Sequence, residues 1–257
     1  RRALGAAARS LSERSETKGV SLTETGSSFR LENDLVTVMI SAEGLITSAI
    51  DKASGRETIP AGRPANLFQL HQDFPNMWDA WDIDKYYRNR VDDLTAVASI
   101  SASVEDGVAT VVVERPFSQS SLRQTITLAP GSRTVHLRNE IDWHETEKLL
   151  KLAFPLDVFA RETAAETQFG FQRRVTHVNT SWEAAKFETS MHRFVLVQED
   201  GGFGAALVND SIYGYDTTRD VDGDDVTTTV RLSLLRAPRF PDPDTDHGRH
   251  EIRVGLV

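Results

Sequence analysis

The chain has 257 residues, and 38 acidic against 29 basic residues give a formal net charge of −9. Hydrophobic residues make up 39% and charged residues 26%, as in an ordinary globular protein. The acidic balance argues against nucleic-acid and anionic-membrane partners. The absence of cysteine excludes disulfides, thiolate metal sites and cysteine nucleophiles.

Residues 1–14 have the one convincing helical pattern of the chain. Its apolar residues fall on one helix face: Leu4, Ala7, Ala8 and Leu11. Gly19 follows in a common stop position, so residues 1–19 are predicted to be a helical remnant or linker. No apolar run has the length of a signal peptide, and without cysteine we expect a cytoplasmic location.

From residue 20 onward the hydrophobic period changes to two. Residues 35–40 and 108–113 are rich in β-branched side chains, and residues 122–128 and 135–141 alternate apolar with polar on either side of a turn at Pro130. Similar strand-like patterns occur at residues 194–197, 204–208 and 226–235. These strands, with no helix between them, predict an all-β fold: a large antiparallel β-sandwich over residues 20–257.

Residues 73–87 combine aromatic and acidic side chains. Trp78 and Trp81 offer flat apolar faces, while Asp79 and Asp82 accept hydrogen bonds from hydroxyl groups. A sugar ring presents both C–H faces and hydroxyls, and a buried strand would not alternate Trp with Asp. This segment predicts an exposed loop at a polyol site, although a surface loop with one Trp buried as a plug fits the composition equally well.

Two acidic runs and seven histidines supply residue types that can bind metals. Counted from Asp220, the twelfth position of an EF-hand would need Glu and holds Arg231, so a tight Asp-Gly turn between strands is preferred. The run from Pro241 to Asp246 is better explained as a structural loop. The histidines show no chelating spacing, and we expect no metal bound within this chain.

Several stretches, taken together, resemble one known family. They are Asp73-Phe74-Pro75 with Trp78-Asp79-Ala80-Trp81-Asp82-Ile83, Glu166 to Gly170 with Gln172-Arg173-Arg174, Thr180 to Glu183 with Lys186-Phe187-Glu188, Asn209-Asp210 with Tyr213-Gly214-Tyr215-Asp216, and Leu232 to Pro238 with Pro241 to Asp244. Glu32-Asn33 and Gly44-Leu45-Ile46 match the opening strands. In this order they resemble the C-terminal β domain of glycoside hydrolase family 38, the retaining, zinc-dependent α-mannosidases.

The resemblance implies a sandwich of the galactose-mutarotase type that forms one wall of a mannose-binding cleft. The family places the nucleophile and the zinc ligands in an N-terminal α/β domain, and nothing here resembles that domain. We therefore expect a fragment that is not catalytic alone, truncated at its C-terminal end, with zinc or another divalent cation bound elsewhere in the full enzyme. Mannosides and the enzyme's own catalytic domain are the expected partners, and a homo-oligomer stays open.

The resemblance also implies site residues. Trp78 or Trp81 is expected to stack on a mannose ring, with Asp79 or Asp82 accepting its hydroxyls. Arg173 or Arg174 is expected to reach the cleft. On residue type alone, arginines of this kind more often pair with a carboxylate or lie in solvent.

Two other functions stay open. A stand-alone carbohydrate-binding module would bind mannosides without a partner domain. A mutarotase or epimerase would need a His–carboxylate pair, for which His71 and Asp73 are the nearest local candidates.

Overall fold

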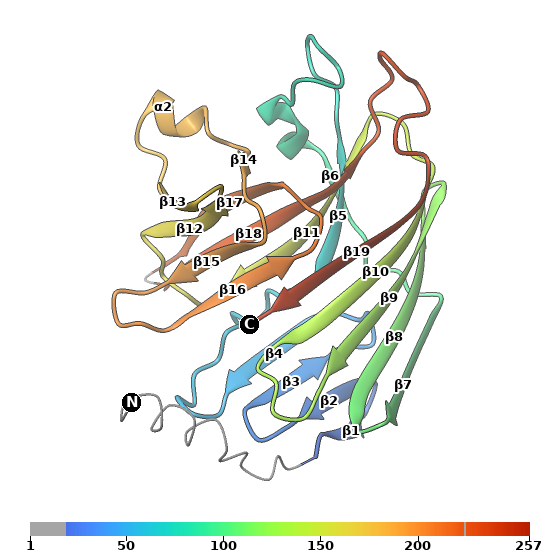
Figure 1. Ribbon diagram of the computed structural model, residues 1–257, viewed down its shortest axis with the longest axis vertical. Helices are drawn as coiled ribbons and strands as arrows, with labels where there is room; N and C mark the ends of the chain where they lie inside the picture. Colours follow the sequence, from blue (N-terminus) through green and yellow to red (C-terminus); the bar gives the residue numbers. More distant parts are fainter. Residues whose placement is uncertain (1–18, 224) are drawn as a thin grey trace, which may run out of the picture.

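The computed structural model describes residues 19–223 and 225–257, so the helix predicted over residues 1–14 lies outside the described residues. Within them the chain is almost entirely β-structure, in three antiparallel sheets (Figure 1). Two short helical elements interrupt the strands, the 3₁₀ turn η1 (Lys85–Asn89) and the single turn α2 (Ser181–Ala184). The hydrophobic pattern did not predict either, because each is too short for a helical period to appear.

The strands divide among sheets of four, nine and six. The four-stranded sheet contains, in spatial order, β1 (Ser21–Thr25), β2 (Ser28–Glu32), β3 (Val36–Ile40) and β4 (Ile46–Asp51). The nine-stranded sheet runs β13 (Gly170–Val175), β12 (Glu162–Thr167), β15 (Phe194–Gln198), β16 (Gly204–Asn209), β19 (Gly248–Leu256), β10 (Val135–Trp143), β9 (Ser120–Leu128), β8 (Val108–Phe117) and β7 (Ser99–Glu105). The six-stranded sheet runs β14 (Thr189–Ser190), β17 (Gly214–Asp222), β18 (Asp225–Arg236), β11 (Lys148–Leu156), β5 (Leu67–Gln72) and β6 (Val91–Asp93).

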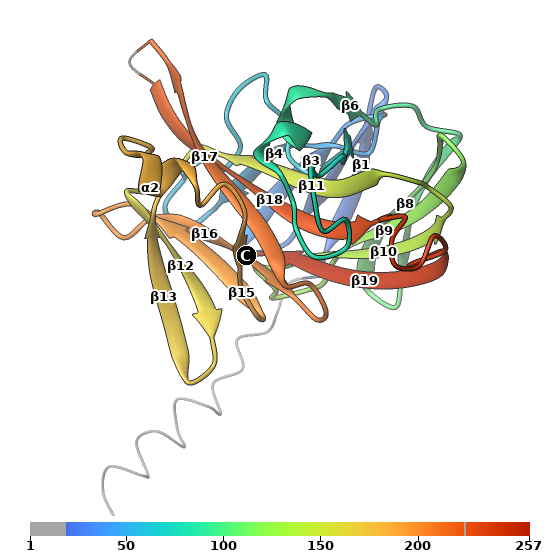
Figure 2. The same ribbon diagram turned by 90° about the horizontal axis from the view of Figure 1, so that it is seen from above.

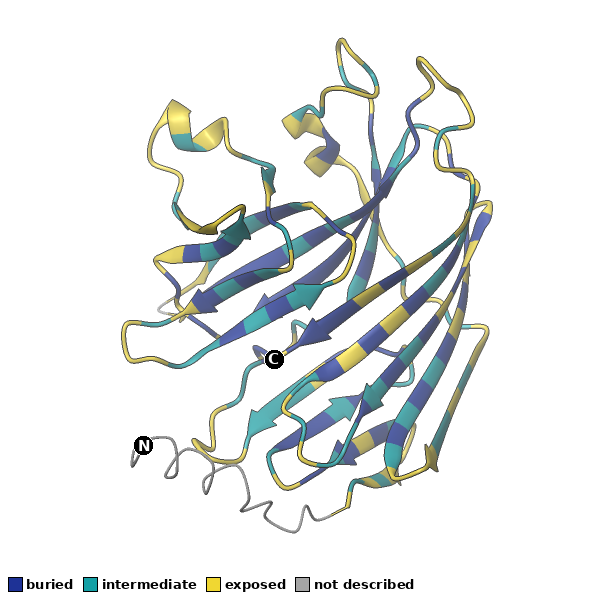
Figure 3. Cartoon of the chain, viewed as in Figure 1, coloured by how far each residue is buried: buried dark blue, intermediate teal, exposed yellow. Residues whose placement is uncertain are grey.

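The two larger sheets lie as layers over one core (Figure 2). Buried and exposed residues alternate along β8, β9 and β10, as Figure 3 shows, because one face of each strand meets the core and the other meets water. The predicted all-β sandwich is therefore confirmed. The turn expected near Gly223 also forms, since β17 and β18 pair as far as Asp222 and Asp225.

Strand β19 lies inside the nine-stranded sheet. It pairs with β10 along its whole length, from Trp143 opposite Gly248 to Val135 opposite Leu256. On its other side it pairs with β16, where Leu207 lies opposite Leu256. The last strand of the chain therefore joins two halves of this sheet that precede it in sequence.

Strand β11 departs from the alternating pattern. Leu149 to Leu156 are all buried, although only Leu150, Leu152, Phe154 and Leu156 belong to the core between the sheets. The opposite face of β11 carries Lys151, whose side chain is 0% exposed. Chain segments outside the sheets must cover that face, and these segments carry the candidate site.

Candidate functional site

Three loops extend from the same end of the two larger sheets (Figure 1). Residues 74–84, here called the aromatic loop, lead into η1. Residues 177–188, the α2 segment, join β13 to β14, and residues 237–247, the C-terminal loop, join β18 to β19. The sites predicted from the sequence lie on the first loop and on the strand before the second.

The aromatic loop displays its tryptophans to solvent. Trp78 is 68% exposed and Trp81 is 88% exposed, and Phe74, Met77 and Tyr86 beside them are exposed as well. The loop closes on itself because the Trp78 carbonyl accepts from the amides of Trp81 (2.6 Å) and Asp82 (2.8 Å). Neither Trp is a buried plug, so the loop presents flat apolar faces to a ligand or to another domain.

Asp79 holds this loop to the C-terminal loop. Its Oδ2 accepts from the backbone amides of Arg239 (2.6 Å) and Phe240 (3.0 Å). One oxygen of this carboxylate, Oδ2, is therefore engaged by the protein itself. No hydrogen bond to the Asp82 side chain occurs among the described residues, so of the two aspartates Asp82 is the freer to accept from a hydroxyl.

An ion pair between buried Asp73 and partly buried Arg236 anchors the base of the aromatic loop. Arg236 Nε donates to Asp73 Oδ2 at 2.7 Å, and Arg236 Nη2 donates to the carbonyls of Asp79 (3.1 Å) and Asp82 (2.8 Å). Asp73 is 3% exposed, and burial raises the pKa of its carboxyl although Arg236 opposes that shift. One guanidinium from β18 thus orders both the strand end and the loop.

Beneath η1 and the α2 segment lies a cluster of buried charges, which we call the lysine cluster. Lys151 Nζ lies 2.6 Å from Glu188 Oε2 and 2.6 Å from Asp216 Oδ2. The Tyr87 hydroxyl lies 3.0 Å from Glu188 Oε2 and 3.3 Å from Lys151 Nζ. Arg88 and Arg231 both donate to Asp216 Oδ1 at 3.1 Å.

The charges of the lysine cluster fix one another's protonation. Burial opposes charge on Lys151, but Asp216 and Glu188 outweigh it and raise the pKa of the ammonium. Burial likewise disfavours the Asp216 carboxylate, yet Lys151, Arg231 and Arg88 lower its pKa. Burial raises the pKa of the Tyr87 hydroxyl to about 12. At neutral pH the cluster therefore holds a charged lysine, charged arginines and a neutral tyrosine.

Glu188 and Asp216 accept from the same ammonium, so they are close enough to resemble the paired carboxylates of a retaining glycosidase. Lys151 lies between them and its side chain is 0% exposed. The ammonium occupies the space between the two carboxylates that a sugar would need, so the pair is structural.

His71 lies beside the lysine cluster as a buried, neutral imidazole. Its ring packs edge-on against Tyr87 with centroids 5.1 Å apart, and Nδ1 lies 3.3 Å from the Tyr87 carbonyl oxygen. Burial, reinforced by the Lys151 charge, lowers the pKa of His71 to about 4. Since Asp73 is engaged by Arg236, these two residues do not form the exposed acid–base pair that a mutarotase would need.

The two predicted arginines lie on β13, in a hairpin with β12 that projects from the sandwich (Figure 2). Arg174 Nη1 donates to the Tyr215 hydroxyl at 3.2 Å, and its Nη2 donates to Gln172 Oε1 at 2.8 Å. Arg173 is exposed, and its Nη1 lies 3.6 Å from Glu162 Oε2. Arg174 thus makes two side-chain hydrogen bonds, whereas Arg173 makes one long ion pair.

Both arginines line a cavity of about 370 Å³ between this hairpin and the α2 segment. Hydroxyl groups of Thr189, Ser190 and Tyr215 share its wall. Donors and acceptors of this kind suit a polyol. The α2 segment that closes the cavity also contacts η1, because Arg88 Nη2 donates to the Phe187 carbonyl at 2.5 Å. The structure thus links the two predicted groups of residues through the α2 segment.

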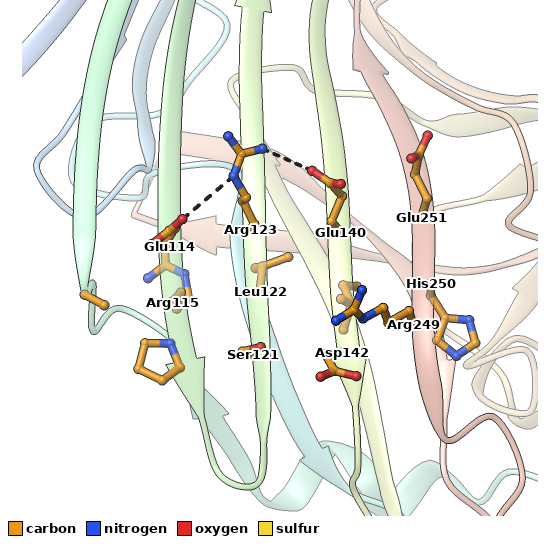
Figure 4. Close-up of a pocket in the computed structure, with 13 residues that line it drawn as sticks. Glu114, Arg115, Ser121, Leu122, Arg123, Glu140, Asp142, Arg249, His250 and Glu251 are labelled. Carbon is orange, nitrogen blue, oxygen red and sulfur yellow. Dashed lines mark hydrogen bonds and ion pairs between the residues drawn. The ribbon is translucent and has the colours of Figure 1, made fainter.

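A larger groove of about 650 Å³ lies elsewhere, on the outer face of β8, β9, β10 and β19 (Figure 4). Its charged residues already pair across strands, since Arg123 lies 3.8 Å from Glu114 and 3.1 Å from Glu140. None of the predicted site residues lines it. We infer that this row of paired charges is a solvated face of the sheet.

The lysine cluster was not predicted from the sequence. One signal was present: Lys151 interrupts an otherwise apolar strand of residues 149–156. A lysine in that setting needs buried carboxylate partners, but these come from residues 188 and 216, which no local pattern connects to it.

Among the described residues, no three His, Asp or Glu side chains come together in a way that could hold a metal ion. In that same part of the chain, none of the helices is both long and apolar enough to cross a bilayer.

Solved structures with this architecture define the class of fold. An alpha-mannosidase from Enterococcus faecalis V583 matches with a TM-score of 0.70 and 17% identity, over 92% of this chain and 30% of that chain. A galactose mutarotase related enzyme from Lactobacillus acidophilus matches with a TM-score of 0.50 and 10% identity, over 90% of this chain and 96% of that chain. At these identities the likeness shows a shared large β-sandwich fold and no more.

Sequence comparison narrows the class to a family. Residues 31–244 match the model of the glycosyl hydrolases family 38 C-terminal domain, and the chain belongs to that family. Alpha-mannosidase 2C1 of Homo sapiens is 37% identical over 237 residues, covering 91% of this chain and 22% of that protein. Alpha-mannosidase of Saccharomyces cerevisiae is 31% identical over 236 residues, covering 86% and 21%. The chain thus spans about a fifth of the length of the curated relatives it matches.

Proposed function

We propose that this chain is the part of a retaining, metal-dependent α-mannosidase that forms one wall of the mannoside-binding cleft. Family membership and the relatives' names support the enzyme class. The observation that carries the local role is the exposed aromatic loop, anchored by the ion pair between Arg236 and buried Asp73. Two exposed tryptophans on an anchored loop are typical of a binding face.

In this proposal the chain supplies recognition rather than bond cleavage. Trp78 or Trp81 stacks on the mannose ring, Asp82 accepts its hydroxyls, and Asp79 acts indirectly by fixing the loop. Arg174, with the hydroxyls of its cavity, contacts a more distant part of the mannoside. The nucleophile, the acid and the ligands of the divalent cation lie outside this chain; when bound there, the cation would polarise the sugar for bond cleavage.

The test is mannoside hydrolysis by the protein that carries this chain, with Trp81→Ala beside wild type. Loss of stacking worth about 1 kcal/mol is expected to raise KM about fivefold. Trp182→Ala is the matched control, because Trp182 is 81% exposed on α2 and has no assigned role. Trp78→Ala is measured in the same way, and if neither Trp78→Ala nor Trp81→Ala raises KM more than Trp182→Ala does, the role of the aromatic loop is refuted.

Chelation of divalent cations and a second variant complete the test. We expect a chelator to abolish turnover, and Arg174→Gln to weaken mannoside binding. Activity that resists chelation would refute the metal dependence, whereas Arg174→Gln with unchanged kinetics would remove β13 from the cleft.

The binding-module alternative makes a different prediction. Because the tryptophans are exposed in the chain by itself, a stand-alone module would bind mannosides with the chain alone as tightly as with the whole protein. Calorimetry with methyl α-mannoside on both decides between them. The buried state of His71 and Asp73 gives the mutarotase alternative no support.

A further inference from the structure

The lysine cluster connects two loops that are distant in sequence. Tyr87 and Arg88 come from η1, directly after the aromatic loop, while Phe187 and Glu188 come from the α2 segment about 100 residues later. Both pairs reach across to the other loop: the Tyr87 hydroxyl donates to Glu188, and Arg88 donates to the Phe187 carbonyl. Each loop is therefore part of the other's anchor.

Strands β11, β17 and β18 provide the fixed base of this connection. Lys151 projects from β11, Asp216 from β17 and Arg231 from β18, and all three meet on the outer face of the six-stranded sheet. Ser233 of β18 also donates to Glu188 Oε1. The loops thus contact three neighbouring strands through charge-assisted hydrogen bonds. Such bonds have defined directions and fix the position of a loop more closely than apolar contacts do.

Burial of the charges makes movement of either loop costly in free energy. Asp216 is 2% exposed and the Lys151 side chain 0%. A shift of either loop that separated Glu188 or Arg88 from the cluster would remove one of the charged partners of buried Lys151 or buried Asp216. The two loops are therefore expected to keep one relative position.

We propose that Lys151, with Asp216 and Glu188, is a positioning centre that holds the aromatic loop and the α2 segment as one rigid unit. The Trp78–Trp81 face and the Arg174 cavity then meet a mannoside in a fixed geometry. The coupling of the loops stands on the contacts alone, and its consequence for mannosides rests on the proposed function.

The decisive measurement is hydrogen exchange of the backbone amides, compared across the two loops. Glu188→Gln keeps the size of the side chain and removes its charge. If the loops share one anchor, amides of residues 76–90 exchange about tenfold faster in this variant, although the substitution lies in the α2 segment. Tyr87→Phe, which removes only a hydroxyl, tests the reverse direction in residues 177–190.

Glu166→Gln is the matched control, since Glu166 also pairs with a cation, Arg193 at 2.7 Å, but contacts neither loop. Faster exchange confined to the substituted loop in both variants would overturn the proposal, as would the same change at residues 76–90 in the control. If Glu188→Gln fails to fold, Tyr87→Phe is used alone, because it changes no charge and removes only a hydroxyl.

Kinetics of the whole protein separate positioning from general stability. Glu188→Gln is expected to raise KM for a mannoside at least fivefold while kcat changes less than twofold, and Glu188→Asp, which restores the charge, is expected to recover part of the loss. Coupled loops with unchanged KM would overturn the positioning role. A wild-type protein that neither binds nor hydrolyses mannosides would refute the proposed function, and the exchange data would then decide the coupling by themselves.

Discussion

Acidification should destabilise this protein through His71. In the folded chain the pKa of His71 is lowered to about 4 by burial and by Lys151, against 6.5 for an ordinary histidine. The unfolded chain therefore binds a proton below about pH 6.5 that the folded chain refuses until about pH 4. Because the unfolded state holds more protons in this window, stability falls as pH falls.

The size of the effect follows from the two pKa values. A difference between 6.5 and about 4 corresponds to about 3 kcal/mol of unfolding free energy, and about 2 kcal/mol of this is lost between about pH 7.5 and about pH 5. His71→Asn retains a donor near Nδ1 but does not titrate, so it should lose much less over the same interval.

The assay is urea unfolding followed by far-ultraviolet circular dichroism at both pH values. Carboxyl groups with lowered pKa, such as Glu32 beside Lys52, add their own loss at more acidic pH in both proteins, so the difference between the two proteins isolates the histidine. Equal losses in wild type and His71→Asn would show that His71 is not a neutral buried group. The acid–base role for His71 would then have to be reconsidered.

Two further changes test the packing around the site. Arg236→Met should cost about 3 kcal/mol in urea unfolding because Asp73 would keep its buried charge without a partner, and Arg239→Met, whose side chain is exposed, should cost little. Gly204→Ala should cost about 2 kcal/mol in thermal or urea unfolding, since its Cβ would lie 2.3 Å from a carbonyl oxygen of β15. Gly201→Ala meets nothing within 4 Å and should be neutral; equal costs for the two glycine changes would refute the steric argument.

The alternating strands of the fold were predictable because their side-chain period is a local property. Residues 122–128 and 135–141 contain that period, and the structure shows it as β9 and β10. The sheet order was not predictable, because the pairing of β10 with β19 joins residues more than 100 positions apart. No pattern within either strand specifies its neighbour.

The candidate site divides in the same way. The aromatic loop was predicted to be exposed, and Trp78 and Trp81 are exposed. Burial of a segment that alternates Trp with Asp would cost the free energy of desolvating its carboxylates. The sequence could not assign separate tasks to Asp79 and Asp82, since the amides that occupy Asp79 come from residues 239 and 240. Whether these residues and Arg173 or Arg174 contact a mannoside stays a prediction.

The place of β19 between β16 and β10 has a consequence for synthesis of the chain. Until residues 248–256 leave the ribosome, β10 and β16 each present an unpaired edge, and the nine-stranded sheet consists of two separate parts. Completion of this part of the sheet must therefore await β19, as expected of a topology dominated by distant contacts. During that delay the open edges of β10 and β16 are exposed to pairing with another chain.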